Sequence, residues 1–131
     1  MMIKGLSVLI LALAATGASA QTGPIGTLQC TGKSVTIRMS IIKPGQLALF
    51  KKAVADHQAW YAKNNNGTKV AYVRLTQRGA GGTLSYDDSA AMTVVTYDSK
   101  PQPKHDDGYA AFVKEYQDSS TVKDEHRGCM G

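Results

Sequence analysis

Three segments of the chain alternate apolar and polar residues with a period of two, which is the pattern of a half-buried β-strand. The segments cover residues 35–41, 68–77 and 90–97, and Lys43-Pro44-Gly45 ends the first of them. We therefore expect three strands. In the first strand the apolar positions are Val35, Ile37, Met39 and Ile41, and the polar ones are Thr36, Arg38 and Ser40.

Two other segments have the periodicity of amphipathic helices. Residues 46–64 place one apolar stripe on a helix, made of Leu47, Phe50, Ala53, Val54, His57, Trp60 and Tyr61. A second helix is predicted to begin at Asp106-Asp107, because carboxylates cap a helix N-terminus well. Its stripe is Tyr109, Phe112, Val113 and Tyr116. Residues 121–127 predict a further helical turn or two.

The order of these elements, β-α-β-β-α without an obvious fourth strand, predicts an α+β, ferredoxin-like domain with an antiparallel sheet. Both helices are expected on one face of the sheet. We expect that face to carry Val35, Ile37, Met39 and Ile41 with Ala71, Val73 and Leu75. The uncovered face would then carry Thr36, Arg38, Ser40, Ile42, Val70, Tyr72, Arg74 and Thr76.

The beginning of the chain has the features of a secretory signal peptide. Lys4 precedes an apolar run over residues 6–15, and Ala18-Ser19-Ala20 supplies small residues for cleavage after Ala20. The run has about half of the ~20 apolar residues that a membrane span needs, so no stable membrane insertion is expected. We interpret residues 1–20 as the signal peptide, 21–32 as an N-terminal lead and 33–131 as the domain of a periplasmic or secreted protein.

The composition of the chain indicates one domain, argues against nucleic-acid binding and predicts a disulfide. The chain has 131 residues, enough for one domain, with 15 Lys and Arg against 10 Asp and Glu. The basic residues are spread along the sequence, and the strand over residues 90–97 lacks the aromatic signature of RNA-recognition domains, so nucleic-acid binding is not expected. In an oxidising compartment, the two cysteines, Cys30 and Cys129, predict a disulfide that joins the two ends of the domain.

The segment V-T-I-R-M-S-I-I-K-P-G over residues 35–45, followed by F-K-K-A-V-A-D-H over 50–57 and Trp60-Tyr61, resembles the dimeric α/β-barrel superfamily. That superfamily includes the antibiotic-biosynthesis-monooxygenase-like proteins. The resemblance covers roughly residues 33–117 in the order and length of the elements. It implies a homodimer in which two sheets pack face to face.

His57 is the candidate catalytic residue, because a histidine on this helix can lie near the pocket in the superfamily and act as a general base. The alternative is a hydrogen-bonded histidine at the edge of the core. Trp60 and Tyr61 are candidates to line a cavity for a flat organic ligand. They are also suited to closing the core between helix and sheet.

Arg38, Tyr72 and Arg74 have the same parity on the expected uncovered face. Two guanidinium groups and a phenol suit a carboxylate or enolate, since arginine presents a planar fork of donors. Contact with a second subunit or with solvent is the alternative.

No metal site and no cofactor are expected. His105-Asp106-Asp107 and the segment 123–126 lack the spacing of zinc ligands, and no nucleotide-binding or hydrolase motif is present. The sequence therefore predicts an exported dimeric barrel that binds a small organic molecule. The alternative is a cofactor-independent monooxygenase-like enzyme acting on a small aromatic or polyketide-like substrate.

Overall fold

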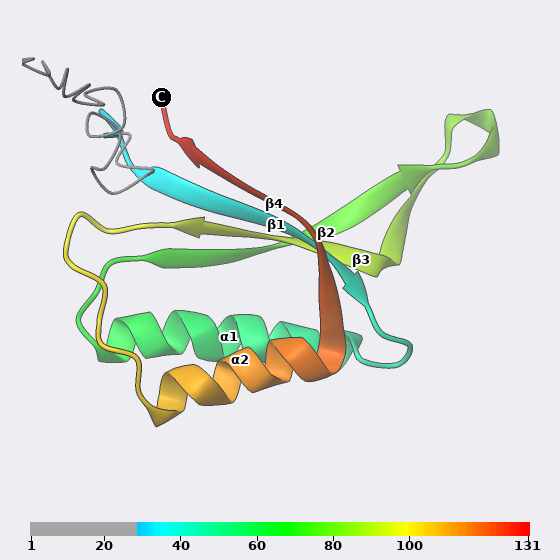
Figure 1. Cartoon of the computed structure of the whole chain (residues 1–131). Helices are drawn as coiled ribbons and strands as arrows, with labels where there is room; N and C mark the ends of the chain where they lie inside the picture. The colour runs from blue at the N-terminus through cyan, green and yellow to red at the C-terminus, as the bar shows by residue number, and fades with distance from the viewer. Residues whose placement is uncertain (1–28) are drawn as a thin grey trace, which may run out of the picture.

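In a computed structural model that describes residues 29–131, a four-stranded antiparallel sheet carries two helices on one of its faces (Figure 1). The elements follow the order β1 (Ser34–Ile42), α1 (Leu47–Lys63), β2 (Lys69–Arg78), η2 (Ala80–Gly82), β3 (Leu84–Thr96), α2 (Asp107–Ser119) and β4 (Ser120–Cys129). The strands lie in the order β2-β3-β1-β4. The predicted α+β class is confirmed, and the arrangement is consistent with a ferredoxin-like fold.

The chain has a fourth strand where the sequence predicted helical turns. β4 pairs with β1 from Ser34 opposite Cys129 to Ile42 opposite Ser120, so the prediction for residues 121–127 is wrong. After Ser120, every residue of β4 is exposed. A solvated edge strand therefore shows no apolar alternation, and pairing with β1 rather than local propensity determines its conformation.

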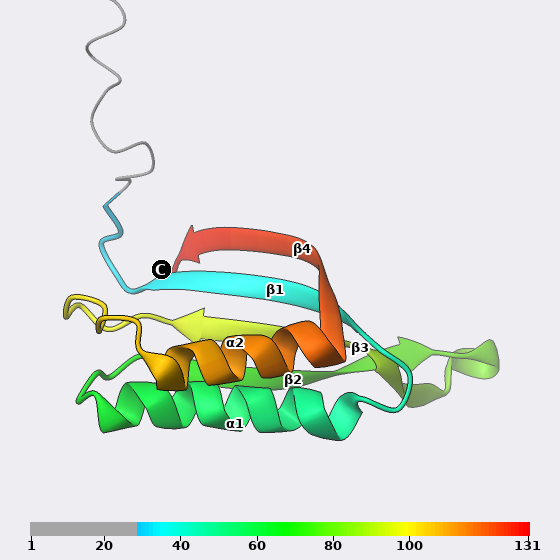
Figure 2. The same ribbon diagram turned by 60° about the horizontal axis from the view of Figure 1, so that its bottom comes forward.

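The helices cover the opposite face of the sheet from the one that we expected. Thr36 is only 2% exposed beneath the helices, whereas Ile41 and Val73 are 42% and 38% exposed on the open face. Figure 2 shows α1 and α2 side by side against the same face. The alternation correctly grouped the residues that share a face. Our prediction that the helices cover the face with Ile37 and Met39 is wrong.

The core lies mainly between α1 and the sheet. Phe50 and Val95 are almost completely buried there, and Phe112 of α2 joins the same cluster. Asp106 caps α2, as predicted, by accepting a hydrogen bond of 3.0 Å from the backbone N–H of Tyr109. The packing of Phe112 against residues of α1 fixes α2 beside α1.

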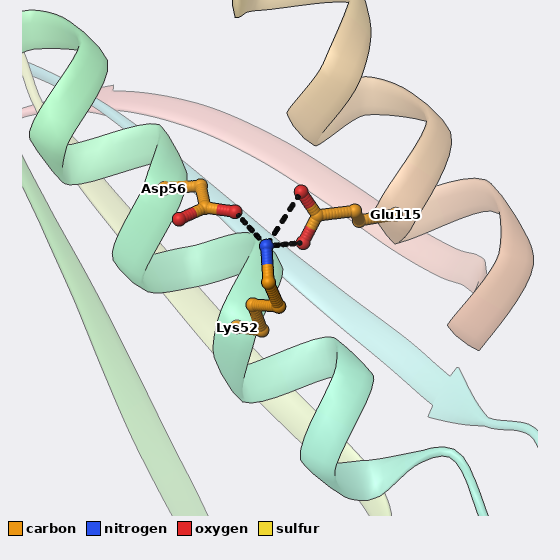
Figure 3. A network of polar contacts seen from close by, with 3 residues as sticks. All are labelled: Lys52, Asp56 and Glu115. Carbon is orange, nitrogen blue, oxygen red and sulfur yellow. Dashed lines mark hydrogen bonds and ion pairs between the residues drawn. The ribbon is translucent and has the colours of Figure 1, made fainter.

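A polar cluster on the surface also joins the two helices (Figure 3). The Lys52 ammonium lies 2.6 Å from Asp56 Oδ2 on its own helix and 3.3 Å from Glu115 Oε2 on α2. Both helices therefore share one cation, although exposed ion pairs of this kind contribute little to stability.

The predicted disulfide between Cys30 and Cys129 is present, with the two Cα atoms 5.4 Å apart. It links the segment before β1 to the last residue of β4, and a disulfide suits an oxidising, exported environment. The predicted signal peptide and most of the predicted N-terminal lead lie outside the described residues. Within residues 29–131, neither helix has the length and hydropathy required to cross a membrane.

Candidate ligand-binding cavity

A cavity of about 990 Å³ lies on the helix-covered side of the sheet, between β1, β4 and α2. This volume is at the upper end of the ~300–1,000 Å³ typical of small-ligand sites. On β1 and β3, three buried residues that line the cavity have small polar side chains. They are Thr36, Ser40 and Thr93.

His57 lines this cavity from α1. It is 7% exposed, its ring stacks on Phe112 with centroids 4.3 Å apart, and its Nδ1 lies 3.1 Å from the Tyr116 hydroxyl. Burial, together with the nearby charge of Arg38, lowers the pKa of His57 to about 4. The imidazole is therefore neutral at neutral pH. Its Nε2 makes no hydrogen bond with any described residue, so it is available to a ligand.

The Tyr116 hydroxyl is the partner of His57, and burial strongly raises its pKa. The phenol therefore stays protonated at neutral pH. Depending on the tautomer of His57, Tyr116 either donates to Nδ1 or accepts from it. Either way the pair presents a neutral, polar wall to the cavity.

Arg38 enters the cavity from the middle of β1. Its Nε donates a hydrogen bond of 2.7 Å to Glu125 Oε2 on β4, and this contact lowers the pKa of Glu125. Arg38 makes no further hydrogen bond within residues 29–131. The two terminal nitrogens of its guanidinium group are consequently available for binding.

One end of the cavity is aromatic. Tyr61 donates a hydrogen bond of 2.8 Å to Gln102, and burial raises the pKa of Tyr61 to about 12. The Tyr97 hydroxyl lies 3.1 Å from Thr36 Oγ1. His105 stacks on the Tyr109 ring with centroids 3.5 Å apart, and both rings also line this end.

The structure brings three of the predicted site residues to the cavity: Arg38, His57 and Tyr61. Trp60 lies behind the cavity wall, where its indole N–H donates a hydrogen bond of 2.8 Å to Asp106. Its position matches the alternative interpretation, in which it closes the core.

Tyr72 and Arg74 do not join Arg38. Both lie on β2, on the far side of β3 from β1, and neither lines the cavity. The Arg74 guanidinium binds both carboxylate oxygens of Asp88, at 2.8 and 2.9 Å, and packs on the Tyr86 ring. The predicted grouping of two arginines and a phenol therefore does not form within the described chain.

Sequence reasoning missed many of the residues that line the cavity, among them Thr93, Tyr97, Phe112 and Tyr116. Phe112 and Tyr116 are four positions apart on one stripe of α2, so the sequence did indicate that they face the same way. Nothing in the sequence indicated that they would meet His57. In residues 29–131, no group of three or more His, Cys, Asp and Glu side chains is placed to hold a metal ion.

Comparison with known proteins gives no family assignment: no family model matches the chain, and no curated protein is similar to it.

Proposed function

We propose that the protein is an exported, homodimeric binding protein for a small organic molecule. The observation that carries this proposal is the cavity of about 990 Å³ whose wall holds polar groups without partners among the described residues. His57 Nε2 and the terminal nitrogens of Arg38 are such groups. A ligand with an apolar body and a polar end would satisfy them while its body lies against Phe112 and the tyrosines.

Binding is favoured over catalysis by the state of His57. A general base works best when its pKa is close to the operating pH. A pKa of about 4 makes His57 a weak base at neutral pH, although a good hydrogen-bond partner. The second candidate function is a cofactor-independent monooxygenase-like reaction on a small aromatic or polyketide-like substrate. It is favoured by the contact between His57 and Tyr116, and it predicts turnover that His57→Gln abolishes.

The homodimer is supported by the composition of the open face of the sheet. That face gathers apolar residues from three strands: Ile37, Met39, Ile41, Ala71, Val73, Leu75, Met92 and Val94. Apolar surface of this extent commonly marks an interface in soluble proteins. A second copy packed face to face, as in a dimeric α/β barrel, would cover it. The cavity lies on the other side of the sheet, so dimerisation leaves it open to ligands.

Export is supported by two independent features. The disulfide between Cys30 and Cys129 suits an oxidising compartment. The sequence before the described residues has the pattern of a signal peptide with cleavage after Ala20.

Native mass spectrometry of the mature protein, isolated from its exported compartment, tests the binding function. We expect a retained small molecule that is lost in Thr93→Phe, because a ring at this position occupies part of the cavity. Thr76→Phe on β2 is the matched control, since Thr76 does not line the cavity. Protein that carries no small molecule and binds none from a mixture of aromatic compounds would contradict the proposal.

A further inference from the structure

We propose that the cavity selects organic anions, and that Glu125 lowers their affinity by partly neutralising the charge of Arg38. In this arrangement the anionic group of the ligand binds the terminal nitrogens of the Arg38 guanidinium. Glu125 contacts the Nε of the same guanidinium. The inference rests on the proposed binding function and adds to it the charge of the ligand and the residue that sets its affinity.

The charges around the cavity favour an anion. The charged residues that line it within residues 29–131 are Arg38, Lys100, Arg127 and one acid, Asp98. The carboxylate of Asp98 already accepts a hydrogen bond of 2.6 Å from the backbone N–H of Gly67. The wall is therefore cationic, and its acid is already engaged.

Arg38 is the cation placed to recognise the ligand. It lies between Thr36 and Ser40 on the helix-covered side of β1, and the register places it opposite Thr93 of β3. Thr93 lines the cavity too, so an anion at Arg38 would lie close to a hydroxyl donor. A guanidinium group can bind a carboxylate, sulfonate or phosphate through two parallel N–H donors.

Glu125 is bound to Arg38 by a contact that leaves the two terminal nitrogens of the guanidinium free. The two residues lie opposite each other on β1 and β4, and their side chains are 33% and 36% exposed. Ion pairs with this exposure are weak because solvent screens them. Glu125 also lies 3.6 Å from Arg127 Nε, so its negative charge is shared between two cations.

Arg74 provides a matched control in the same sheet. It also pairs with one carboxylate, that of Asp88, but it uses both Nε and Nη2 for this and packs on Tyr86. Arg74 does not line the cavity. A general effect of removing one positive charge would therefore be the same in Arg38→Met and Arg74→Met.

The experiment uses two fluorescent probes with the same aromatic frame, 8-anilinonaphthalene-1-sulfonate and its neutral analogue N-phenyl-1-naphthylamine. The Kd of each is measured for the mature wild type, Arg38→Met, Arg74→Met and Glu125→Gln. We expect Arg38→Met to weaken binding of the sulfonate by about tenfold or more, because charged hydrogen bonds are lost. Glu125→Gln should tighten it about two- to fivefold. Arg74→Met should leave the Kd of both probes unchanged, and in Arg38→Met the Kd of the neutral probe should change far less than that of the sulfonate.

The two variants of the ion pair keep the proposal testable. Arg38→Met and Glu125→Gln break the same ion pair. If the loss of this pair only destabilised the protein, both variants would bind the sulfonate more weakly. Weaker sulfonate binding in Arg38→Met together with tighter binding in Glu125→Gln supports the proposal. Equal losses of sulfonate affinity in Arg38→Met and Arg74→Met, or no gain of sulfonate affinity in Glu125→Gln, would overturn it. Neutral-probe binding that Thr93→Phe removes, without preference for the sulfonate, would overturn the anion inference alone. Failure of both probes to bind would overturn the proposed function as well.

Discussion

Replacing Met92 with lysine tests whether a second copy covers the open face of the sheet. Met92 lies opposite Met39 on the two central strands, so it occupies the middle of that face. In a dry interface an unpaired charge costs about 3–5 kcal/mol, and the two-fold axis of a homodimer doubles this to about 6–10 kcal/mol. Since 1.4 kcal/mol is a factor of ten, Kd should rise by at least ~10⁴.

Sedimentation equilibrium of the mature protein measures this effect. We expect wild type to be a dimer and Met92→Lys to be a folded monomer, because a lysine on a solvated strand is tolerated. Ala110→Lys on the exposed side of α2 is the control and should remain dimeric. A monomeric wild type at micromolar concentrations, or a dimeric Met92→Lys, would refute the reasoning.

Three further predictions concern stability. Replacing Cys30 and Cys129 with serine releases a closed loop of 99 residues and should lower the free energy of unfolding by about 4–5 kcal/mol in a urea titration; no change would contradict a structural role for the disulfide. His57 has a pKa of about 4 when folded and 6.5 when unfolded, so between these values only the unfolded chain takes up the proton. Stability should therefore fall as the pH drops from 7 to 4, by about 3 kcal/mol more in wild type than in His57→Gln, and parallel pH profiles would refute this. Trp60→Phe loses the hydrogen bond to Asp106 and should cost about 1–2 kcal/mol in thermal unfolding followed by circular dichroism, while probe affinity stays unchanged; weaker binding would instead make Trp60 part of the site.

Local periodicity predicted three strands and both helices because each of these elements buries one side. It could not identify β4, whose residues after Ser120 are exposed along their whole length. The expected disulfide, however, did indicate where the last segment of the chain lies. A bridge between Cys30 and Cys129 places the end of the chain beside the start of β1, where an antiparallel partner can form.

The error in the covered face has a physical cause. A period of two determines which residues point the same way, but not which side the helices occupy. We assumed that the helices cover the more apolar group, with Ile37 and Met39. The aromatic rings of α1 and α2 instead supply the bulk opposite Thr36 and Ser40, and the apolar group is left open.

The candidate site was predictable only in part for the same reason. His57 was identified because it lies on the apolar stripe of the predicted helix and because of the resemblance to the superfamily, and Tyr61 because an aromatic ring there can line a cavity. Arg38 was identified from its parity, but on the side of the sheet that we expected to be open. Its separation from Arg74 depends on the order of the strands, which places β3 between β1 and β2. No local pattern contains that information.

Methyl NMR of the mature protein during titration with N-phenyl-1-naphthylamine tests the central claim most directly. The threonine methyl groups of Thr36 and Thr93 report on the cavity, and the methionine methyl groups of Met39 and Met92 report on the open face. The account predicts that the ligand shifts the two threonine signals and leaves the two methionine signals in place. Shifts confined to Met39 and Met92 would contradict it.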